Sequence, residues 1–362
     1  MFYIFIDRQE ELYAWVEDVA NIEVLGFDTE FFWERTYFPQ LCLIQVAAGD
    51  LIACIDILAL EDLSVLKRIM KSPTVKKVFH AAKQDIEVLH VVSLEPSAQL
   101  LDTQIAAGLL GMADQIGYGD LVEATVGMRL EKSQTRTDWT SRPLSVRQLD
   151  YAANDVRYLA EMAEIMSQKL TSLGRLDWWF EDCLRLQQSH GSVLAPWERV
   201  SGIGKLEIKD FEVAMNLAVW RDNKAKEINL PRGWIFSDKQ LLSIALDRPK
   251  TLKELSSILK DKPDMLRKFS TNILQLIGNS CQKSASNMNR KAPLSISERQ
   301  LAKEIKKKVA TIAEELAIGP SVLCTSKEVD RCLRGDVPER IFAGWRKDFL
   351  YSLLEPIQRF HR

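Results

Sequence analysis

The chain has 362 residues, which is too long for one ordinary hydrophobic core and predicts two or three domains. Its hydrophobic fraction of 46% and charged fraction of 27% are those of a soluble globular protein. Uncharged runs reach only 14 residues, as in residues 36–49, and are too short to cross a bilayer. Composition therefore excludes a membrane-embedded class, and we expect no membrane association.

The N-terminus and the cysteines bear on the cellular compartment. Residues 1–15 lack a basic region before their apolar run and turn acidic at once, so we expect no signal peptide. Six cysteines are scattered without a CxxC pair, which favours reduced thiols over a zinc site or disulfides. Both observations predict a cytoplasmic protein.

The net charge of −2 hides an asymmetry between the two halves of the chain. Residues 1–170 carry 15 Lys+Arg against 26 Asp+Glu, a net −11, whereas the remainder carries 33 against 24, a net +9. This split suggests one part that binds cations and another that meets a polyanion. The alternative is a pair of solvated surfaces of unlike sign, which predicts no salt-dependent binding.

Residues 1–80 alternate short apolar runs with helical segments. The expected strands are residues 1–6, 24–27, 42–48, 52–55 and 77–79, and the expected helices are residues 9–20, capped by Asp7, and 63–70. Gly49-Asp50 is a hairpin turn signal between two of these strands. The pattern predicts an α/β domain with a mixed sheet covered by helices.

Two acids follow the central strand directly. Asp28 and Glu30 are two residues apart, so strand geometry points both carboxylates to the same side. Neighbouring carboxylates repel each other unless a positive charge lies between them, and a hard divalent cation such as Mg²⁺ or Mn²⁺ suits oxygen ligands. The alternative for this pair alone is two exposed acids at a strand end.

Residues 80–89, HAAKQDIEVL, suit a helix that follows a strand, with Asp85 in its first turns. Taken alone, Asp85 is an ordinary surface acid, and His80 is a capping or hydrogen-bonded core histidine. Residues 100–103 predict another strand. Asp102 is most simply the N-cap of a helix over residues 104–110.

A further helix is expected to begin at Ser145 and to run to about residue 170. Ser145 and Gln148 have the spacing of a capping box. Tyr151 and Asp155 are four residues apart on this helix, so both side chains leave the same face one turn apart. A tyrosine on a helix face is usually core packing, but the acid beside it suggests a second role.

The chain closely resembles the ribonuclease D family, within the DEDD superfamily of 3′→5′ exonucleases. Asp28 and Glu30 in FDTEF match the first motif of that superfamily, Asp85 in HAAKQD the second, and Tyr151 with Asp155 in YAAND the third. The flanking words PQLCLIQ, LLDTQIAA, EKSQTRTDW and RPL are also similar to this family. The resemblance extends from residue 1 to about residue 190.

The third motif places the chain in the tyrosine branch of the superfamily. The other branch has a histidine five residues before the last acid, where this chain has Asp150. The resemblance implies that Asp28, Glu30, Asp85 and Asp155 bind two divalent cations, Mg²⁺ or Mn²⁺, and that Tyr151 orients the attacking water.

Three cations before the Tyr151 helix are candidates for contacts with substrate phosphates. They are Lys132, Arg136 and Arg142, and the alternative for each of them is a surface salt bridge.

The C-terminal half resembles helicase-and-RNase-D C-terminal (HRDC) domains, small helical bundles that bind nucleic acid. AVWRDNKAKEINLPRGWIFSD identifies a first copy, and GDVPERIFAGWRKDFL a second, more divergent one, for which a merely structural bundle is the alternative. The expected architecture is an exonuclease domain with a ribonuclease H-like mixed sheet and a helical extension, followed by two all-α bundles. The expected boundaries are 1–190 for the exonuclease domain, 191–206 for a linker, and 207–285 and 293–362 for the two bundles.

The resemblance implies a cytoplasmic, monomeric 3′→5′ exoribonuclease that trims tRNA precursors and other structured RNA and releases 5′-nucleoside monophosphates. Two alternatives stay open. One is a 3′→5′ DNA exonuclease with the same metal site, because RNA is distinguished by its 2′-hydroxyl and no residue here is assigned to that contact. The other is a non-catalytic RNA-binding scaffold, which the five intact site positions disfavour.

Overall fold

A computed structural model of the chain describes residues 2–130, 137–189, 195–280 and 294–359. The chain divides into two compact units. Unit 1 comprises residues 1–32, 40–191 and 294–362, and unit 2 comprises residues 33–39 and 192–293. Within the described ranges, no helix is both long and apolar enough to span a membrane.

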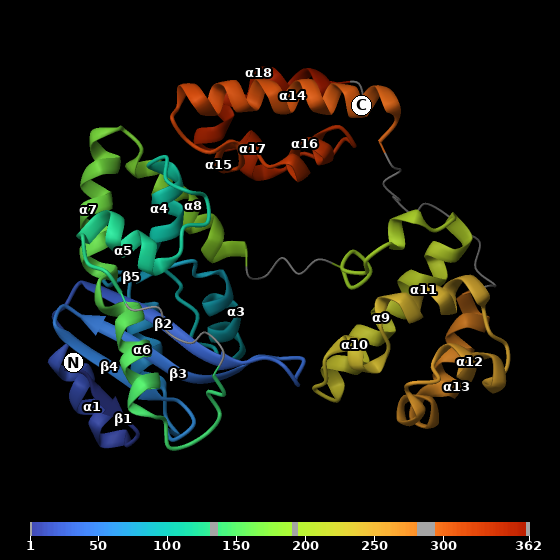
Figure 1. Cartoon of the computed structure of the whole chain (residues 1–362), viewed down its shortest axis with the longest axis horizontal. Coiled ribbons are helices and arrows are strands. Elements are labelled where there is room, and N and C mark those ends of the chain that lie inside the picture. The colour runs from blue at the N-terminus through green and yellow to red at the C-terminus, as the bar shows by residue number, and fades with distance from the viewer. Residues whose placement is uncertain (1, 131–136, 190–194, 281–293, 360–362) are drawn as a thin grey trace. The chain divides into compact units, whose positions relative to one another are not determined.

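The centre of unit 1 is a six-stranded mixed sheet in the order β1-β4-β3-β2-β5-β6 (Figure 1). The strands are β1 Ile4–Ile6, β2 Val24–Phe32, β3 Gln40–Ala48, β4 Leu51–Asp56, β5 Lys76–Phe79 and β6 Leu100–Asp102. β3 pairs antiparallel with β2 and β4, and the other neighbours pair in parallel. This confirms the predicted α/β domain with a mixed sheet.

Helices cover both faces of this sheet. The first eight are α1 Gln9–Asp18, α2 Ser64–Lys71, α3 Lys83–Val91, α4 Thr103–Leu109, α5 Tyr118–Val126, α6 Val146–Arg157, α7 Leu159–Ser172 and α8 Leu176–Ser189. On one face, Phe27 and Ile44 pack with residues of α1, α2 and α3. On the other face, Leu43 and Ala47 pack with residues of α4 to α8. Alternate residues of β2 and β3 therefore enter two separate cores.

Several sequence predictions for these elements need correction. The central strand does not end before the acids, because β2 continues to Phe32 with a bulge between Glu30 and Phe31. Asp7 does not cap the first helix, whose N-cap is Arg8 without a side-chain cap. The helix from Ser145 is interrupted at Tyr158, which separates α6 from α7.

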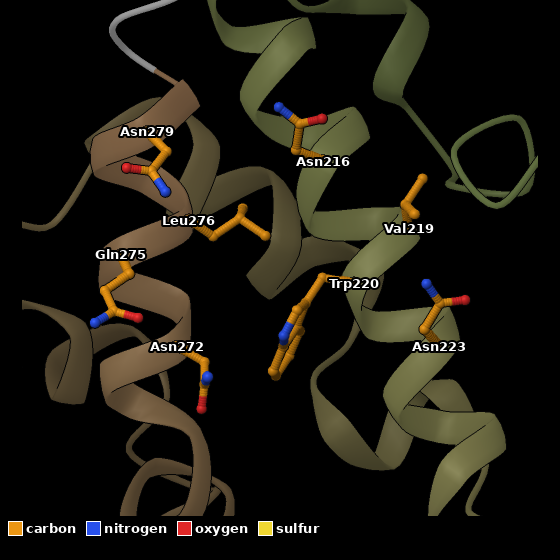
Figure 2. A pocket seen from close by; sticks show the side chains of 8 residues that line it. All are labelled: Asn216, Val219, Trp220, Asn223, Asn272, Gln275, Leu276 and Asn279. Carbon is orange, nitrogen blue, oxygen red and sulfur yellow. The ribbon is translucent and has the colours of Figure 1, made fainter.

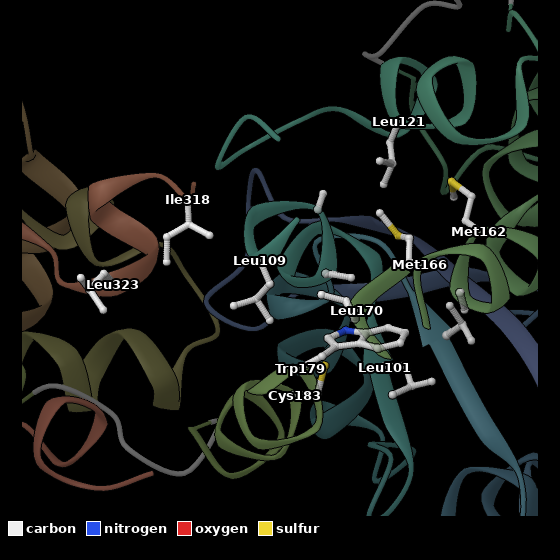
Figure 3. Close-up of a cluster of buried hydrophobic side chains, with 14 of the residues drawn as sticks. Leu101, Leu109, Leu121, Met162, Met166, Leu170, Trp179, Cys183, Ile318 and Leu323 are labelled. Carbon is white, nitrogen blue, oxygen red and sulfur yellow. The ribbon is translucent and has the colours of Figure 1, made fainter. Parts of the chain in front are cut away.

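The last five helices also belong to unit 1, and α18 contacts α8. They are α14 Ile296–Glu315, α15 Pro320–Leu323, α16 Ser326–Cys332, α17 Glu339–Phe342 and α18 Trp345–Arg359. Trp345 stacks on Trp178 with ring centroids 4.2 Å apart, and its backbone N–H donates to Glu181 at 2.9 Å. Ile318, which precedes α15, and Leu109 of α4 belong to the same cluster of buried hydrophobic side chains (Figure 3).

A buried ion pair also connects α18 to α8. The Arg346 side chain is 1% exposed. Both of its terminal nitrogens donate hydrogen bonds to the Asp182 carboxylate, at 2.5 and 2.7 Å. Arg346 also donates to the Val322 carbonyl. A guanidinium that is buried this deeply is tolerated only while its partners are present.

Unit 2 is helical, as the sequence predicts beyond residue 207. It contains η1 Ile203–Lys205, α9 Ile208–Glu227, α10 Arg232–Ile235, α11 Asp238–Asp247, α12 Leu252–Ile258 and α13 Pro263–Ser280. The segment 33–39, which connects β2 to β3 in the sequence, contributes Tyr37 to this unit. The Tyr37 hydroxyl donates to Asp222 at 3.0 Å, and Asn229 accepts from the Tyr37 backbone N–H.

Asp182→Ala should destabilise the protein strongly, because it leaves the Arg346 charge buried without its carboxylate. We expect the free energy of unfolding to fall by about 3 kcal/mol. Asp264→Ala is the matched control, since it removes an Arg267 partner that is 70% exposed and should have little effect. Urea denaturation of the full-length variants measures both changes. Equal stabilities would show that the pair does not hold α18 in place.

Candidate active site

Three predicted carboxylates converge on the face of the sheet that α6 covers. Asp28 and Glu30 lie opposite Gln45 and Leu43 of β3, and Leu43 belongs to the core beneath α6. Oxygen atoms of Asp28, Glu30 and Asp155 lie within 4.8 Å of one another. All three side chains are partly buried, so their oxygens are crowded yet open to a small ion.

The fourth acid, which is not one of the three whose oxygens lie within 4.8 Å, contacts β2 from its other face. Asp85, in the first turn of α3, is 7% exposed and accepts a 2.5 Å hydrogen bond from the Thr29 hydroxyl. Thr29 lies between the two acids of β2 and faces away from them. The charge of Asp85 nevertheless raises the pKa of Asp28, so the four acids form one electrostatic group.

Asp102 fixes the turn from which α3 begins. As predicted, it caps α4 by accepting from the backbone N–H groups of Gln104 and Ile105. The same carboxylate also accepts from Ala81 and Ala82, at 3.1 and 2.9 Å. Ala81 has a φ of 57°, and these bonds hold that left-handed conformation. Asp102 therefore sets the direction of the helix that carries Asp85.

His80 is a hydrogen-bonded core residue. Its ring nitrogens lie 2.9 Å from the Thr103 hydroxyl and 3.0 Å from the Ile116 carbonyl. Both nitrogens are therefore occupied by protein groups, which confirms the structural interpretation of this histidine.

Two sets of local contacts fix the helix that carries Asp155. The capping box of Ser145 and Gln148 starts α6 at the predicted residue. The Tyr118 hydroxyl donates to the Asn154 carbonyl at 2.9 Å and accepts from the Tyr158 N–H at 3.2 Å. These bonds fix the junction between α6 and α7 immediately beside Asp155.

Gly26 allows that junction to approach the sheet closely. A Cβ atom at this position would lie 2.9 Å from the Cβ of Leu159 and 3.0 Å from the Val156 carbonyl oxygen. Distances this short require the helices to shift. The absence of a side chain at Gly26 therefore helps to bring Asp155 to the acids of β2.

Burial raises the pKa of each acid in this group, and repulsion by the neighbouring acids adds to it at Asp28 and Glu30. Burial is the largest cause throughout, and the Asp85, Asp155 and Glu30 charges add to it for Asp28, whose pKa lies well above its ordinary value. The pKa of Glu30 rises to about 9 and that of Asp155 to about 7. The Thr29 hydrogen bond opposes the effect of burial at Asp85, whose pKa is about 6. At neutral pH the cluster therefore favours holding protons or binding a cation.

Tyr151 lies at the edge of the cluster. Its ring stacks on Trp139 with centroids 6.3 Å apart, and its side chain hydrogen-bonds to Asp155. Burial, followed by the charges of Asp155 and Glu30, raises the tyrosine pKa above its ordinary value. Tyr151 is thus a neutral hydroxyl that is oriented toward the acids.

The three cations proposed for phosphate contacts are not brought to the cluster by any described interaction. Lys132 and Arg136 fall outside the described residues. Arg142 donates to Asp56 at 2.5 and 2.6 Å and to the Cys42 carbonyl at 3.2 Å, so its guanidinium binds protein acceptors. Contacts of these residues with substrate stay a prediction.

One buried amide beside the cluster was not anticipated from the sequence. Gln45, the cross-strand neighbour of Asp28, is fully buried, and both polar atoms of its side chain lack a hydrogen-bond partner within the described part of the chain. An orphaned buried amide costs stability. Its only sequence signal is a polar residue within an apolar strand, which does not specify where the side chain points.

The mixed sheet and the carboxylate cluster define a nuclease of the 3′–5′ exonuclease class. Residues 3–171 match the family model described as 3′-5′ exonuclease, and residues 210–277 match the model described as HRDC domain. The chain belongs to the ribonuclease D family and is a 3′→5′ exoribonuclease.

Relatives of nearly full length support this assignment. Ribonuclease D of Desulfotalea psychrophila is 33% identical over 95% of this chain and 96% of that protein. The Escherichia coli K12 ribonuclease D is 30% identical over 98% of both chains. The E. coli RNase D crystal structure, described as an exoribonuclease involved in structured RNA processing, matches with a TM-score of 0.91 over 99% of both chains.

Gly26→Ala should lower activity by displacing the helices that carry Asp155. We expect a loss of about 1–3 kcal/mol in the free energy of unfolding, because the added methyl overpacks the junction. Gly119→Ala is the matched control, since a Cβ there meets no atom within 4 Å. Thermal denaturation and cleavage rates of both variants measure the difference. Full activity of Gly26→Ala would show that the close approach is unimportant.

Proposed function

We propose that Asp28, Glu30, Asp85 and Asp155 hold two divalent cations, Mg²⁺ or Mn²⁺, with which the enzyme trims the 3′ ends of tRNA precursors and other structured RNA. The products are 5′-nucleoside monophosphates. The observation that carries this proposal is the convergence of carboxylate oxygens from β2 and α6 to within 4.8 Å, with the charge of Asp85 acting on Asp28.

The donor set suits hard cations. All four side chains offer carboxylate oxygens, which Mg²⁺ and Mn²⁺ prefer over nitrogen or sulfur ligands. Burial, with neighbouring negative charges added at Asp28 and Glu30, raises the pKa values of these acids, and bound cations would favour their ionised forms. The Gln45 amide, the cross-strand neighbour of Asp28, has polar atoms that no described protein group satisfies. When bound, two such cations stabilise charge on the attacking and leaving oxygens of a phosphodiester.

The remaining chemistry concerns the position of the attacking water. A phenol whose pKa is raised above its ordinary value stays protonated at neutral pH, so Tyr151 does not accept the proton of the attacking water efficiently. Its hydroxyl hydrogen-bonds to Asp155, and stacking on Trp139 fixes the position of its ring. We assign Tyr151 the role of orienting water by a hydrogen bond, and the acids the role of ligands.

The charge distribution supports capture of RNA by the helical regions. Residues 1–170 carry a net −11, which repels a polyanion at long range, whereas the remaining residues carry +9. In this proposal the modules at 207–285 and 293–362 hold the body of a tRNA precursor while its 3′ end enters the exonuclease domain, 1–190, of a monomeric enzyme. The E. coli relative is described as acting in structured RNA processing, which supports the same substrate class.

One assay tests the proposed function. The purified protein is incubated with 3′-extended tRNA, linear RNA and single-stranded DNA, with Mg²⁺, with Mn²⁺ or with EDTA. We expect mononucleotides from RNA, with extended tRNA trimmed, and no release in EDTA. Preferential release from DNA would favour a DNA exonuclease, and no metal-dependent release would favour a binding scaffold. Asp85→Asn should lose activity by orders of magnitude, and an active variant would contradict the four-ligand assignment.

Tyr151→Phe should separate water orientation from metal binding. The change removes only the hydroxyl and keeps the ring that stacks on Trp139, so the fold and the four carboxylates persist. We expect kcat to fall about 10²-fold, the range for one group that handles a proton. Cation affinity, measured by calorimetry, should stay within about twofold. Undiminished turnover would reduce Tyr151 to a packing residue.

A further inference from the structure

A groove of about 530 Å³ lies between α9 and α13 of unit 2, far along the sequence from the acid cluster. Its eight lining residues recur at helical spacing, so each helix contributes one continuous face. Figure 2 shows Asn216 and Asn279 at one end of the groove and Asn223 and Asn272 at the other. The two helices therefore run antiparallel along its walls.

All eight lining residues are uncharged, and five of them are amides. The amides are Asn216, Asn223, Asn272, Gln275 and Asn279. An amide side chain carries both a donor and an acceptor, which matches the edges of nucleobases. Phosphate groups, in contrast, are bound chiefly by lysine and arginine. The groove is thus suited to bases and not to the phosphate backbone.

The apolar part of the groove is held in a fixed position. Trp220, between the amide positions of α9, projects between the two helices (Figure 2). Its indole is stacked parallel to Phe236 at 6.1 Å and meets the edge of Phe269 at 5.6 Å. An aromatic side chain whose conformation is already set gives a surface for a flat base at little entropic cost.

Cationic side chains are present beside one end of the groove. Lys268 is exposed one helical turn before Asn272, on the same side of α13. Lys224 follows Asn223 and lies 5.9 Å from the centre of the Phe269 ring, where it also pairs with Glu227. A strand whose bases enter the neutral groove would therefore place its phosphates near positive charge at this end.

We propose that this groove binds unpaired bases of the RNA substrate. Between Asn216 and Asn223 the α9 wall is about 10 Å long, which accommodates two or three stacked nucleotides. Proteins recognise RNA sequence mostly in single-stranded segments, where the base edges are free to form hydrogen bonds. This inference rests on the proposed function, in which a structured RNA is held while its single-stranded 3′ end is trimmed. It adds a site that distinguishes unpaired from paired segments.

Binding measurements on the full-length protein in EDTA test this site without turnover. The probes are a fluorescent single-stranded RNA 12-mer and an abasic ribose-phosphate oligomer of the same length. The test variant is Asn272→Ala/Gln275→Ala, and Thr271→Ala, an exposed residue of the same helix outside the groove, is the matched control. Asn223→Ala/Asn279→Ala provides a second test variant, and circular dichroism melting confirms that each protein is folded.

We expect the test variants to bind the base-bearing RNA on the order of tenfold more weakly, because two amide contacts are lost. Affinity for the abasic oligomer should change less than about twofold. The slope of log Kd against log salt should stay that of the wild type, because no phosphate contact is removed. The Thr271→Ala control should match the wild type in all three measurements.

Three results would overturn the proposal. They are an unchanged affinity for the base-bearing RNA, an equal loss on the abasic oligomer, and a change in oligomeric state that makes the groove a contact between copies of the chain. Metal-dependent cleavage of a dinucleotide separates this failure from failure of the proposed function. That reaction needs only the acid cluster, so it persists if the groove alone is misassigned.

Discussion

Repulsion among four crowded carboxylates is the constraint on which the rest of the exonuclease domain depends. Asp28, Glu30 and Asp155 lie with oxygens within 4.8 Å of one another, and Asp85 adds its charge through the sheet. Burial raises their pKa values, with repulsion added at Asp28 and Glu30, so the arrangement opposes folding until protons or cations are bound. The scaffold must therefore hold these side chains in place against a force that separates them.

The contacts that resist this repulsion come from elements far apart in the chain. Asp102 fixes the start of α3, and Tyr118 holds the α6–α7 junction. Gly26 lets that junction approach β2. The sheet, its bulge after Glu30 and the neighbouring helix ends thus bring carboxylates of β2 and α6 to the same small volume.

Local patterns made much of this site predictable. The spacing of Asp28 and Glu30 follows from strand geometry, and the capping box at Ser145 fixes the helix on which Tyr151 and Asp155 lie one turn apart. Such local patterns do not predict contacts between residues that are far apart in the sequence. The hydrogen bond from Thr29 to Asp85 and the orphaned Gln45 depend on how strands and helices pack. The attachment of α18 to α8 through Arg346 and Asp182 depends on residues 164 positions apart.

The most direct test of this account follows the melting temperature of the metal-free protein between pH 6 and pH 8.5, with and without Mg²⁺. A folded carboxyl whose pKa is raised keeps its proton longer than the unfolded one, so stability falls as pH rises through this window. We predict that the wild type loses stability toward pH 8.5, that Mg²⁺ restores it most there, and that Asp28→Asn reduces both effects. A metal-free melting temperature that rises with pH, together with an equal Mg²⁺ effect in Asp28→Asn, would contradict the account.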